Sequence, residues 1–222
     1  MADQVEHQGR LIAIDGTRGK DIGAAAAAVI DALKQRSVAC AISRFDASGL
    51  FGELTAAGRG DRNISARTLT LVYAADLAFR LRWEIRPVLE SGGIVIAAPY
   101  TETAIAFGSA AGLEEAWIRE LLRFAPKPGY RSRAEEKKVG RGWKPRLDRG
   151  YAEYCVAMLG ASSQKVARKR VRRDAMALLH RPKERKIYRL TDNGVAELVK
   201  AVTGNRRDAA RRSTSKLRNG RS

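Results

Sequence analysis

The stretch Arg10-Leu-Ile-Ala-Ile-Asp15 leads directly into Gly16-Thr-Arg-Gly-Lys20 and then into an alanine-rich run over residues 22–36. A short apolar run that ends in an acid and a glycine is typical of a buried parallel strand. The run that follows contains five consecutive alanines, and it predicts a helix because alanine has the highest helix propensity. A second apolar segment at 38–43 completes the pattern, so this part of the chain predicts a β-α-β unit.

The rest of the chain continues this alternation of helix-period segments and continuous apolar segments. In order, we expect a loop with a short helix at 47–63, a long helix at 65–91 with Ser65 as its N-cap, a strand at 94–98, a helix at 113–124, helices at 151–159 and 166–179, a strand at 187–190, and a helix that Thr191 or Asp192 caps and that ends at Val202. The predicted fold class is α/β, a parallel sheet flanked by helices, with a basic helical C-terminal part.

The charge is divided unevenly along the chain. Residues 1–130 hold 15 basic and 15 acidic side chains, whereas residues 131–222 hold 27 basic and 9 acidic ones and carry the whole net charge of +18. The aliphatic content of the first part excludes a fully disordered protein. The sequence has no bilayer-length apolar run and no apolar stretch near its polar start. Two cysteines and two histidines exclude a His-rich zinc site, so we expect a reduced, cytoplasmic chain with no membrane partner.

Residues 16–21 stand where phosphate loops stand, between a strand and a helix. Such a loop needs glycines that let backbone N–H groups turn inward, a lysine that reaches the phosphates, and the amino end of a helix. Gly16 and Gly19 are separated by two residues rather than four, and Asp21 replaces the Ser or Thr whose hydroxyl holds magnesium. These residues alone leave two interpretations open: a shortened phosphate loop, or a tight β-α turn whose Lys20 is solvated.

Several segments, in their order along the chain, resemble the thymidylate kinases, which are nucleoside-monophosphate kinases of the P-loop class. They are Leu11-Ile-Ala-Ile-Asp-Gly16 with Gly19-Lys20, Ser43-Arg44, Gly52-Glu53, Leu71-Val-Tyr-Ala-Ala-Asp76, Ile85-Arg-Pro-Val-Leu-Glu-Ser-Gly-Gly-Ile-Val-Ile96, Tyr100 with Ala106-Phe-Gly108, and Lys186-Ile-Tyr-Arg-Leu190. The resemblance covers residues 10–125 and more loosely 147–203. It implies a three-layer, P-loop NTPase-like sheet with substrates at the carboxyl ends of the strands.

The resemblance also implies a reaction and the residues that serve it. The family reaction is the phosphorylation of dTMP to dTDP by ATP with Mg²⁺, and Lys20 and Arg44 are the implied catalytic residues. The implied phosphate-binding residues are Gly16, Thr17, Arg18, Gly19, Lys20 and Asp21, and those for the monophosphate and base are Arg44, Phe79 and Tyr100. Magnesium is assigned to Asp21, with Asp46 as an alternative, and a lid over the phosphates to Arg131, Arg133, Arg141 and Arg146.

The departures from the family fall on its chemistry. The family's Asp-Arg pair after the third strand is Ala98-Pro99 here, its Glu-Pro after the second strand is Phe45-Asp46, and its Arg after Ala-Ala-Asp is Leu77. We also expect its fourth strand to be absent and a basic loop at 127–149 to take its place. Losing one electrostatic donor commonly costs about 10²–10³ in rate. The sequence therefore leaves open whether the chain is an active kinase or a pseudoenzyme.

The basic last third supports a hypothesis from another class, a non-catalytic protein that binds nucleic acid or a partner through residues 131–222. One predicted helix places cations at a spacing that suits a phosphate backbone. These cations are Lys165, Arg168, Lys169, Arg170, Arg172 and Arg173. The alternative is a solvated face that keeps the chain soluble. A weaker similarity relates residues 188–194 to the wing of a winged helix.

The predicted organisation is one domain with two disordered ends. Its parts are a disordered N-terminus at 1–9, a P-loop kinase-like core at 10–125, a basic, lid-like segment at 126–150, C-terminal helices and the last strand at 151–204, and a disordered basic tail at 205–222. The predicted partners are ATP, dTMP, non-specific nucleic acid and a second copy of the chain in a homodimer.

Overall fold

The structure is a computed structural model that describes residues 9–57, 64–135, 157, 165–181 and 186–204, with the backbone alone at 165–169. Its centre is a five-stranded sheet in the order β2-β3-β1-β4-β5, in which neighbouring strands run parallel. The strands are β1 (Arg10–Asp15), β2 (Ala41–Arg44), β3 (Ile94–Ala98), β4 (Tyr130–Arg133) and β5 (Ile187–Arg189). This arrangement confirms the predicted α/β class with a parallel, P-loop NTPase-like sheet.

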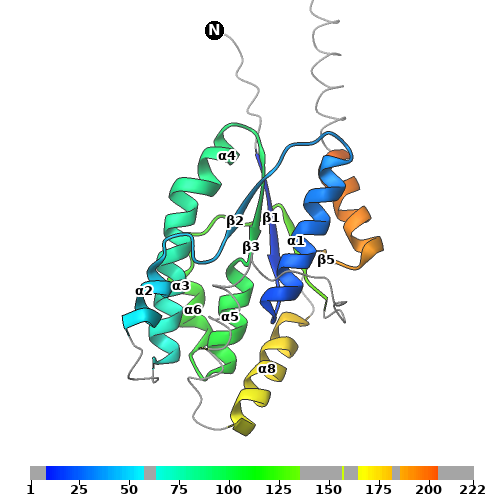
Figure 1. The fold of residues 1–222 in the computed structure, drawn as a ribbon. Coiled ribbons are helices and arrows are strands. Elements are labelled where there is room, and N and C mark those ends of the chain that lie inside the picture. Colours follow the sequence, from blue (N-terminus) through cyan, green and yellow to red (C-terminus); the bar gives the residue numbers. More distant parts are fainter. Residues whose placement is uncertain (1–8, 58–63, 136–156, 158–164, 182–185, 205–222) are drawn as a thin grey trace, which may run out of the picture.

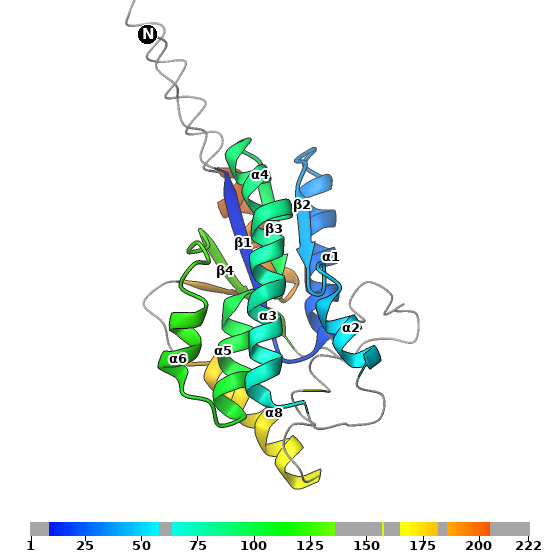
Figure 2. The ribbon, with the colours of Figure 1, turned by 90° about the vertical axis from the view of Figure 1, so that its left-hand side faces the viewer.

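Helices cover both faces of the sheet and give three layers (Figures 1 and 2). One face carries α1 (Gly19–Lys34) and the last helix, residues 192–204. The other face carries α3 (Ala66–Arg80), η1 (Leu81–Ile85), α4 (Arg86–Glu90), α5 (Thr101–Ala110) and α6 (Glu115–Leu121), with α2 (Leu50–Ala57) beside α3. Helix α8 (Lys165–Leu179) packs on α5 and lies beyond the carboxyl ends of the strands (Figure 1).

The core lies on both sides of the two central strands. β1 and β3 pair from Arg10 with Ile94 to Ala13 with Ala97, and all five residues of β3 are buried. Fully buried aliphatic side chains of α1 and α3, among them Leu33 and Leu69, belong to the same hydrophobic cluster as the side chains of β1 and β3. Each such side chain contributes about 1.5–3 kcal/mol when it leaves water. The core therefore fixes β1 and β3, whose ends carry the segments considered below.

The long helix predicted over 65–91 is present as three successive pieces, α3, the π-helical η1 and α4. Ser65 Oγ accepts the amide hydrogen of Thr68 at 3.0 Å, which confirms Ser65 as the N-cap. Pro87 lies in the first turn of α4, directly after the π-helical η1. Gly92 follows with φ of 75°, a left-handed conformation that favours glycine and ends the helix.

The prediction that the fourth strand is absent, with a basic loop in its place, was wrong. Residues 130–133 form β4, which pairs with β1 from Ile12–Tyr130 to Asp15–Arg133 and with β5 on its other side. Its sequence, Tyr-Arg-Ser-Arg, has no aliphatic run, so it lacks the pattern that marks β1 and β3. Backbone pairing holds it in place together with the Ser132 hydroxyl, which donates to the Ala13 carbonyl oxygen at 2.7 Å.

The described C-terminal elements match their prediction closely. α8 and β5 appear where expected, and the amide of Gly194 donates to Thr191 Oγ1 at 3.2 Å, so Thr191 is the N-cap of the last helix. The helix predicted at 151–159, of which the structure describes residue 157 alone, falls largely outside the described residues, as do Arg141, Arg146 and the two chain ends. Within the described helices, none combines the length and apolar character needed to cross a bilayer.

Candidate functional site

The carboxyl ends of the five parallel strands meet at one edge of the sheet, called the carboxyl edge below. From β1 the chain crosses to the β2 side, whereas from β3 it crosses to the β4 side, so the winding direction reverses between β1 and β3. In open parallel sheets, ligands bind outside the carboxyl ends at such a reversal. The segments that follow β1, β2 and β3 therefore form the candidate site.

The loop from β1 to α1 is tightly packed. The amide of Gly16 donates to Thr103 Oγ1 at 3.2 Å, and a Cβ at this position would meet Ile22 Cγ1 at 3.0 Å. The Arg18 carbonyl oxygen accepts from the amides of Asp21 at 3.1 Å and Ile22 at 3.2 Å, which starts α1. The Asp21 side chain is buried and forms an ion pair with Nε of Arg18. Several donors and the acid of this loop thus have partners within the chain.

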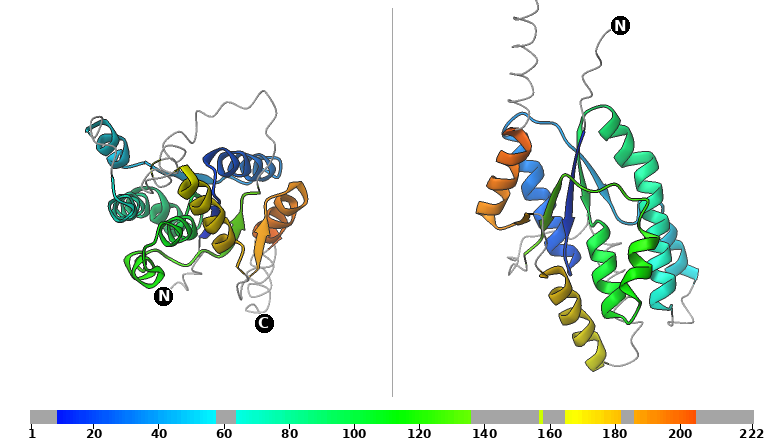
Figure 3. Two further views of the ribbon diagram at one scale, coloured as in Figure 1. Left: turned by 90° about the horizontal axis from the view of Figure 1, so that it is seen from below. Right: turned by 180° about the vertical axis from the view of Figure 1, so that it is seen from behind.

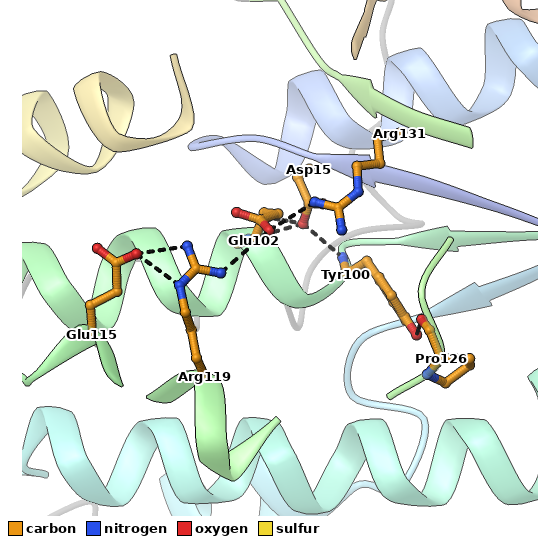
Figure 4. A network of polar contacts seen from close by, with 8 residues as sticks. Asp15, Tyr100, Glu102, Glu115, Arg119, Pro126 and Arg131 are labelled. Carbon is orange, nitrogen blue, oxygen red and sulfur yellow. Dashed lines mark hydrogen bonds and ion pairs between the residues drawn. The ribbon is translucent and has the colours of Figure 1, made fainter. Parts of the chain in front are cut away.

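Asp15, the last residue of β1, caps α5 from a distance in sequence (Figure 4). Its Oδ1 accepts from the amide of Tyr100 at 3.0 Å, the amide of Thr103 at 2.9 Å and the Thr103 hydroxyl at 2.7 Å. Burial, and second the nearby charge of Glu102, raise the pKa of Asp15 to about 6. The carboxyl therefore occupies the amino end of α5, a position where helices bind anions.

A chain of charged side chains runs outward from this point over α5, α6 and β4 (Figure 4). Glu102 contacts Arg131 at 3.0 Å and Arg119 at 3.8 Å, and Arg119 contacts Glu115 at 2.7 Å. Glu115 also meets Arg181, just beyond α8, at 3.3 Å. Arg131, which the sequence assigned to a lid, is thus part of β4 and is engaged with an acid of α5.

A second polar cluster lies at the ends of β2 and β3, around the fully buried side chain of Arg80. Its guanidinium donates to Ser43 Oγ at 2.8 Å, the Ser43 carbonyl oxygen at 3.0 Å and the Pro99 carbonyl oxygen at 2.9 Å. Asp76, also fully buried, lies 3.9 Å away and accepts the amide of Ser48 at 2.9 Å. Burial raises the pKa of Asp76, and Arg80 opposes this shift. The cluster joins both strand ends to α3.

Arg133 connects the carboxyl edge to α8. Its Nη1 donates to the carbonyl oxygen of Leu179, the last residue of α8, at 3.1 Å, and Nη2 lies 3.5 Å from Glu135. Burial lowers the pKa of Arg133. Seen from below, α8 crosses the carboxyl end of the sheet (Figure 3). The second predicted lid arginine therefore serves as a C-cap that holds α8 across the strand ends.

The predicted binding residues fall into accessible and inaccessible groups. Lys20 is exposed in the first turn of α1, and Arg44 ends β2 at the same edge. Because neighbouring strands are about 4.8 Å apart, the ends of β2 and β1, with β3 between them, are about 10 Å apart. Tyr100 is 1% exposed, and its hydroxyl donates to the Pro126 carbonyl oxygen at 2.8 Å (Figure 4), whereas Phe79 is 40% exposed on α3.

Aromatic rings also gather behind Arg44. Phe45 stacks on Tyr73 with ring centroids 5.2 Å apart, and it meets Phe51 at 5.6 Å. The Tyr73 hydroxyl donates to the Tyr100 carbonyl oxygen at 2.7 Å. These rings are buried against one another, so they serve as the packing floor of the β2 end.

The predicted nucleic-acid surface is only partly described. Arg170 and Arg173 are exposed on α8, and both pair with Asp174, at 3.5 Å and 3.2 Å. Arg172 is half-buried, while the side chains of Lys165, Arg168 and Lys169 lie outside the described residues. The described part of this face therefore holds three arginines and one acid that partly offsets them.

Comparison with known proteins identifies relatives for parts of this chain. It is 40% identical over 65 residues to a probable thymidylate kinase of Thermococcus gammatolerans, which is 29% of this chain and 31% of that protein. Over 123 residues it is 30% identical to one of Pyrobaculum aerophilum and 26% identical to probable thymidylate kinase 2 of Saccharolobus solfataricus, covering 60% and 57% of those proteins. Over these parts, the chain is similar to probable thymidylate kinases. No family model matches it.

The chain spans about a third to about three fifths of the length of the proteins that it matches. Lys20 and Arg44, two residues that the resemblance assigns to phosphate binding, both lie at the carboxyl edge. Two positions where the sequence departs from the family's pattern can be located. Ala98 ends β3 and Pro99 follows it, so neither supplies a charged side chain, and Leu77 is buried in the core.

The residues present do not fit a magnesium ion held in the way of the family. The position of the hydroxyl ligand is Asp21, and Arg18 already supplies a cation to its carboxylate. Both oxygens of Asp46, the alternative ligand, accept amides of α2, from Phe51 at 3.0 Å and Gly52 at 2.8 Å. Among the described residues, no three His, Cys, Asp or Glu side chains are grouped as metal ligands. We therefore derive no step through magnesium.

Sequence reasoning missed three residues that organise the site, Arg80, Thr103 and Ser132. Arg80 had a detectable signal, because it follows Asp76 by four residues on the same helix face as Leu69 and Tyr73. A charged pair on the apolar face of a helix indicates a buried cluster. Thr103 and Ser132 carried no such signal, since their partners lie 88 and 119 residues away along the chain.

Proposed function

We propose that this chain binds nucleoside phosphates at the carboxyl edge, with dTMP and ATP as the ligands of the ancestral kinase reaction. The observation that supports the proposal is the placement of Lys20 and Arg44 at one edge of a parallel sheet in a relative of probable thymidylate kinases. Because the similarity covers only part of those proteins, substrate and activity both belong to the proposal.

Lys20 binds phosphate groups in this proposal. Its side chain is exposed in the first turn of α1, where the helix dipole adds to the positive potential. A helix leaves its first-turn amides without intrahelical acceptors, so those of Gly19 and Lys20 support the same anion. Gly16, Thr17 and Arg18 form the loop that sets the position of this turn.

Arg44 binds the monophosphate of the second nucleotide. Arg80 holds the preceding residue, Ser43, through one hydrogen bond to its hydroxyl and one to its carbonyl oxygen. A guanidinium is suited to bidentate phosphate contacts and stays charged at any physiological pH. Phosphoryl transfer needs both phosphates positioned and neutralised, and the family's Asp-Arg pair is absent here, so binding and turnover are tested separately.

Isothermal titration calorimetry of the full chain with dTMP and with ATP tests the binding. Lys20→Ala and Arg44→Ala are the test variants, and Lys34→Ala and Arg86→Ala are matched controls because both side chains are exposed away from the carboxyl edge. Each test variant should weaken binding about tenfold, the usual effect of losing one charge-assisted phosphate contact. The controls should bind as the unmodified chain does.

Turnover is measured as formation of dTDP from dTMP and ATP, with Lys20→Ala as the negative control. Binding without turnover would identify a nucleotide-binding pseudoenzyme, whereas turnover that Lys20→Ala abolishes would identify an active kinase. The absence of a calorimetric signal with both nucleotides would reject the proposal.

The second candidate function is non-specific nucleic-acid binding through the exposed face of α8. Its support is the exposed pair Arg170 and Arg173 within a segment that carries the whole net charge of +18. Such binding follows the phosphate backbone and weakens steeply with salt. Removing residues 131–222 is not a usable test, because β4 and β5 are strands of the sheet.

A gel-shift titration with Arg170→Ser, Arg173→Ser tests this candidate in the full chain. The double variant should reduce the slope of log affinity against log salt by about one to two units. Arg123→Ser is the control, because Arg123 is exposed and pairs with Glu120 away from α8. If the unmodified chain, the double variant and the control all bind a given nucleic acid with the same affinity, α8 is not the binding surface.

A homodimer is the proposed assembly. Leu71, Phe79 and Trp83 are 45%, 40% and 65% exposed, and Phe79 and Trp83, four residues apart, lie on the same face of α3 and η1. Sedimentation velocity should detect a dimer that Phe79→Ser, Trp83→Ser converts to monomer. A monomer at every concentration of the unmodified chain would reject it.

A further inference from the structure

Four aspartates at the carboxyl edge, among the described residues, accept hydrogen bonds or an ion pair from donors of the chain itself. Asp15 accepts three hydrogen bonds from the start of α5, and Asp46 accepts two amides of α2. Asp76 accepts the amide of Ser48 and faces Arg80, and Asp21 is paired with Arg18. Magnesium in phosphate sites is held by one or two carboxylates together with the phosphates. Each of these four aspartates of the described residues is therefore already engaged by a donor of the chain itself.

The Asp21 pair has the most direct consequence. The Asp21 side chain is 3% exposed, Nε of Arg18 donates to its Oδ2, and its Oδ1 is buried without a hydrogen-bond partner. A buried carboxylate without a nearby cation is strongly destabilised. Arg18 therefore supplies the cation that a metal would otherwise supply at this position, and it belongs to the loop.

We propose that nucleotide binding at the β1–α1 loop does not require a divalent cation, because the Arg18 guanidinium replaces magnesium on the residue at the metal-ligand position. The inference rests on the proposed nucleotide site and specifies how its charge is balanced. The loop presents the exposed Lys20 to the phosphates, and the neutralised Asp21 does not repel them. A fixed arginine keeps this balance at every magnesium concentration.

A cycle of substitutions tests the role of Arg18. Calorimetric affinities for ATP are measured with excess EDTA and with millimolar Mg²⁺ for the unmodified chain, Arg18→Met, Asp21→Asn and the double variant. The unmodified chain should bind equally well in both buffers, within about twofold. Arg18→Met exposes the phosphates to the Asp21 charge, so its affinity should fall about tenfold in EDTA and recover with Mg²⁺. Asp21→Asn and the double variant should show no magnesium dependence.

A loss of affinity of about tenfold for the unmodified chain on adding EDTA would overturn the inference. An Arg18→Met variant that binds equally in both buffers would also overturn it. Circular dichroism checks that each variant is folded. If Arg18→Met does not fold, the unmodified chain is compared with Asp21→Asn. A metal ion held by Asp21 would make ATP binding magnesium-dependent in the unmodified chain but not in Asp21→Asn, and that result would overturn the inference.

A readout without nucleotide separates this inference from the proposed function. Electron paramagnetic resonance counts the Mn²⁺ bound by the nucleotide-free chain. The unmodified chain and Asp21→Asn should bind the same number of Mn²⁺ ions. Arg18→Met should bind an additional ion through the Asp21 carboxylate. Mn²⁺ bound through Asp21 in the unmodified chain would overturn the inference even if no nucleotide binds. Failure of nucleotide binding together with the expected Mn²⁺ result would reject the proposed function alone.

Discussion

The two sides of the sheet are held together in different ways. On the side of β2, β3 and β1, the strands are largely aliphatic, and β3 and most of β1 are buried. On the side of β4 and β5, the strand sequences are Tyr-Arg-Ser-Arg and Ile-Tyr-Arg, and β5 is only half-buried or exposed. Yet both sides pair in the same parallel way. The strand side chains of the first side are mostly apolar, whereas those of the second side are mostly polar.

The contrast between the two sides shows which strands can be predicted from sequence patterns. Apolar burial is local and periodic, so it marks a strand before its neighbours are known. A polar edge region is specified by partners that the chain brings from far away, such as the Tyr130 hydroxyl and the Ala201 carbonyl oxygen at 3.2 Å.

The largest effect is expected at Arg80, on the side of β2, β3 and β1. Among the described residues, it is the one arginine whose side chain is fully buried. Arg80→Met removes three hydrogen bonds and leaves Asp76 as an uncompensated buried charge, which should cost about 3–5 kcal/mol. Urea unfolding measures the loss. The double variant Arg80→Met, Asp76→Leu should recover part of it, because it removes both charges. A loss equal to that of the exposed control Arg82→Met would show that the cluster does not hold the strand ends.

The second effect concerns Asp15, where the two sides meet. Its folded-state pKa is raised by burial from 3.8 to about 6, so proton binding favours the folded state. This contribution is complete below the ordinary pKa and is lost as pH rises through 6, by about 3 kcal/mol in all. Asp15→Asn keeps the acceptor for the amides of α5 and cannot titrate. Its unfolding free energy should therefore change less between pH 4 and pH 7 than that of the unmodified chain.

The third effect tests the polar side through Ser132. Ser132→Ala deletes the buried hydrogen bond to the Ala13 carbonyl oxygen and should lower the unfolding free energy by about 1 kcal/mol. Thr55→Ala is the control, because Thr55 makes an exposed hydrogen bond within α2. Equal changes in the two variants would mean that backbone pairing alone positions β4.

The smallest effect is the response of β5 to salt. Arg189 lies 3.7 Å from Glu135, and Lys186 lies 3.2 Å from Glu197, and these exposed pairs are each worth about 0–1 kcal/mol. Molar sodium chloride shortens the Debye length to about 3 Å and should increase hydrogen exchange at β5 while leaving β1 and β3 unchanged. Faster exchange at both places would indicate that the two sides open as one unit.

The fold of the first half followed from its sequence because each element carries its own pattern. The alanine run, the Ser65 cap and the aliphatic strands β1 and β3 predicted structure locally, and the structure has each of them. The placement of Lys20 and Arg44 at one edge also followed, since parallel strands end together. β4 was missed because Tyr-Arg-Ser-Arg has neither alternation nor an apolar run.

The residue pattern alone predicted the β-α-β start, the parallel sheet and the resemblance to thymidylate kinases, and it shows the uneven charge. The roles of the polar residues became visible only in the folded chain: Asp15 caps α5, Arg18 neutralises Asp21, Arg80 joins two strand ends, and Arg133 holds α8 across the edge. The two kinds of interaction differ in how far apart along the sequence the partners can lie. Apolar burial depends on a residue and its near neighbours, whereas a hydrogen bond or ion pair depends on a partner whose distance in sequence has no limit.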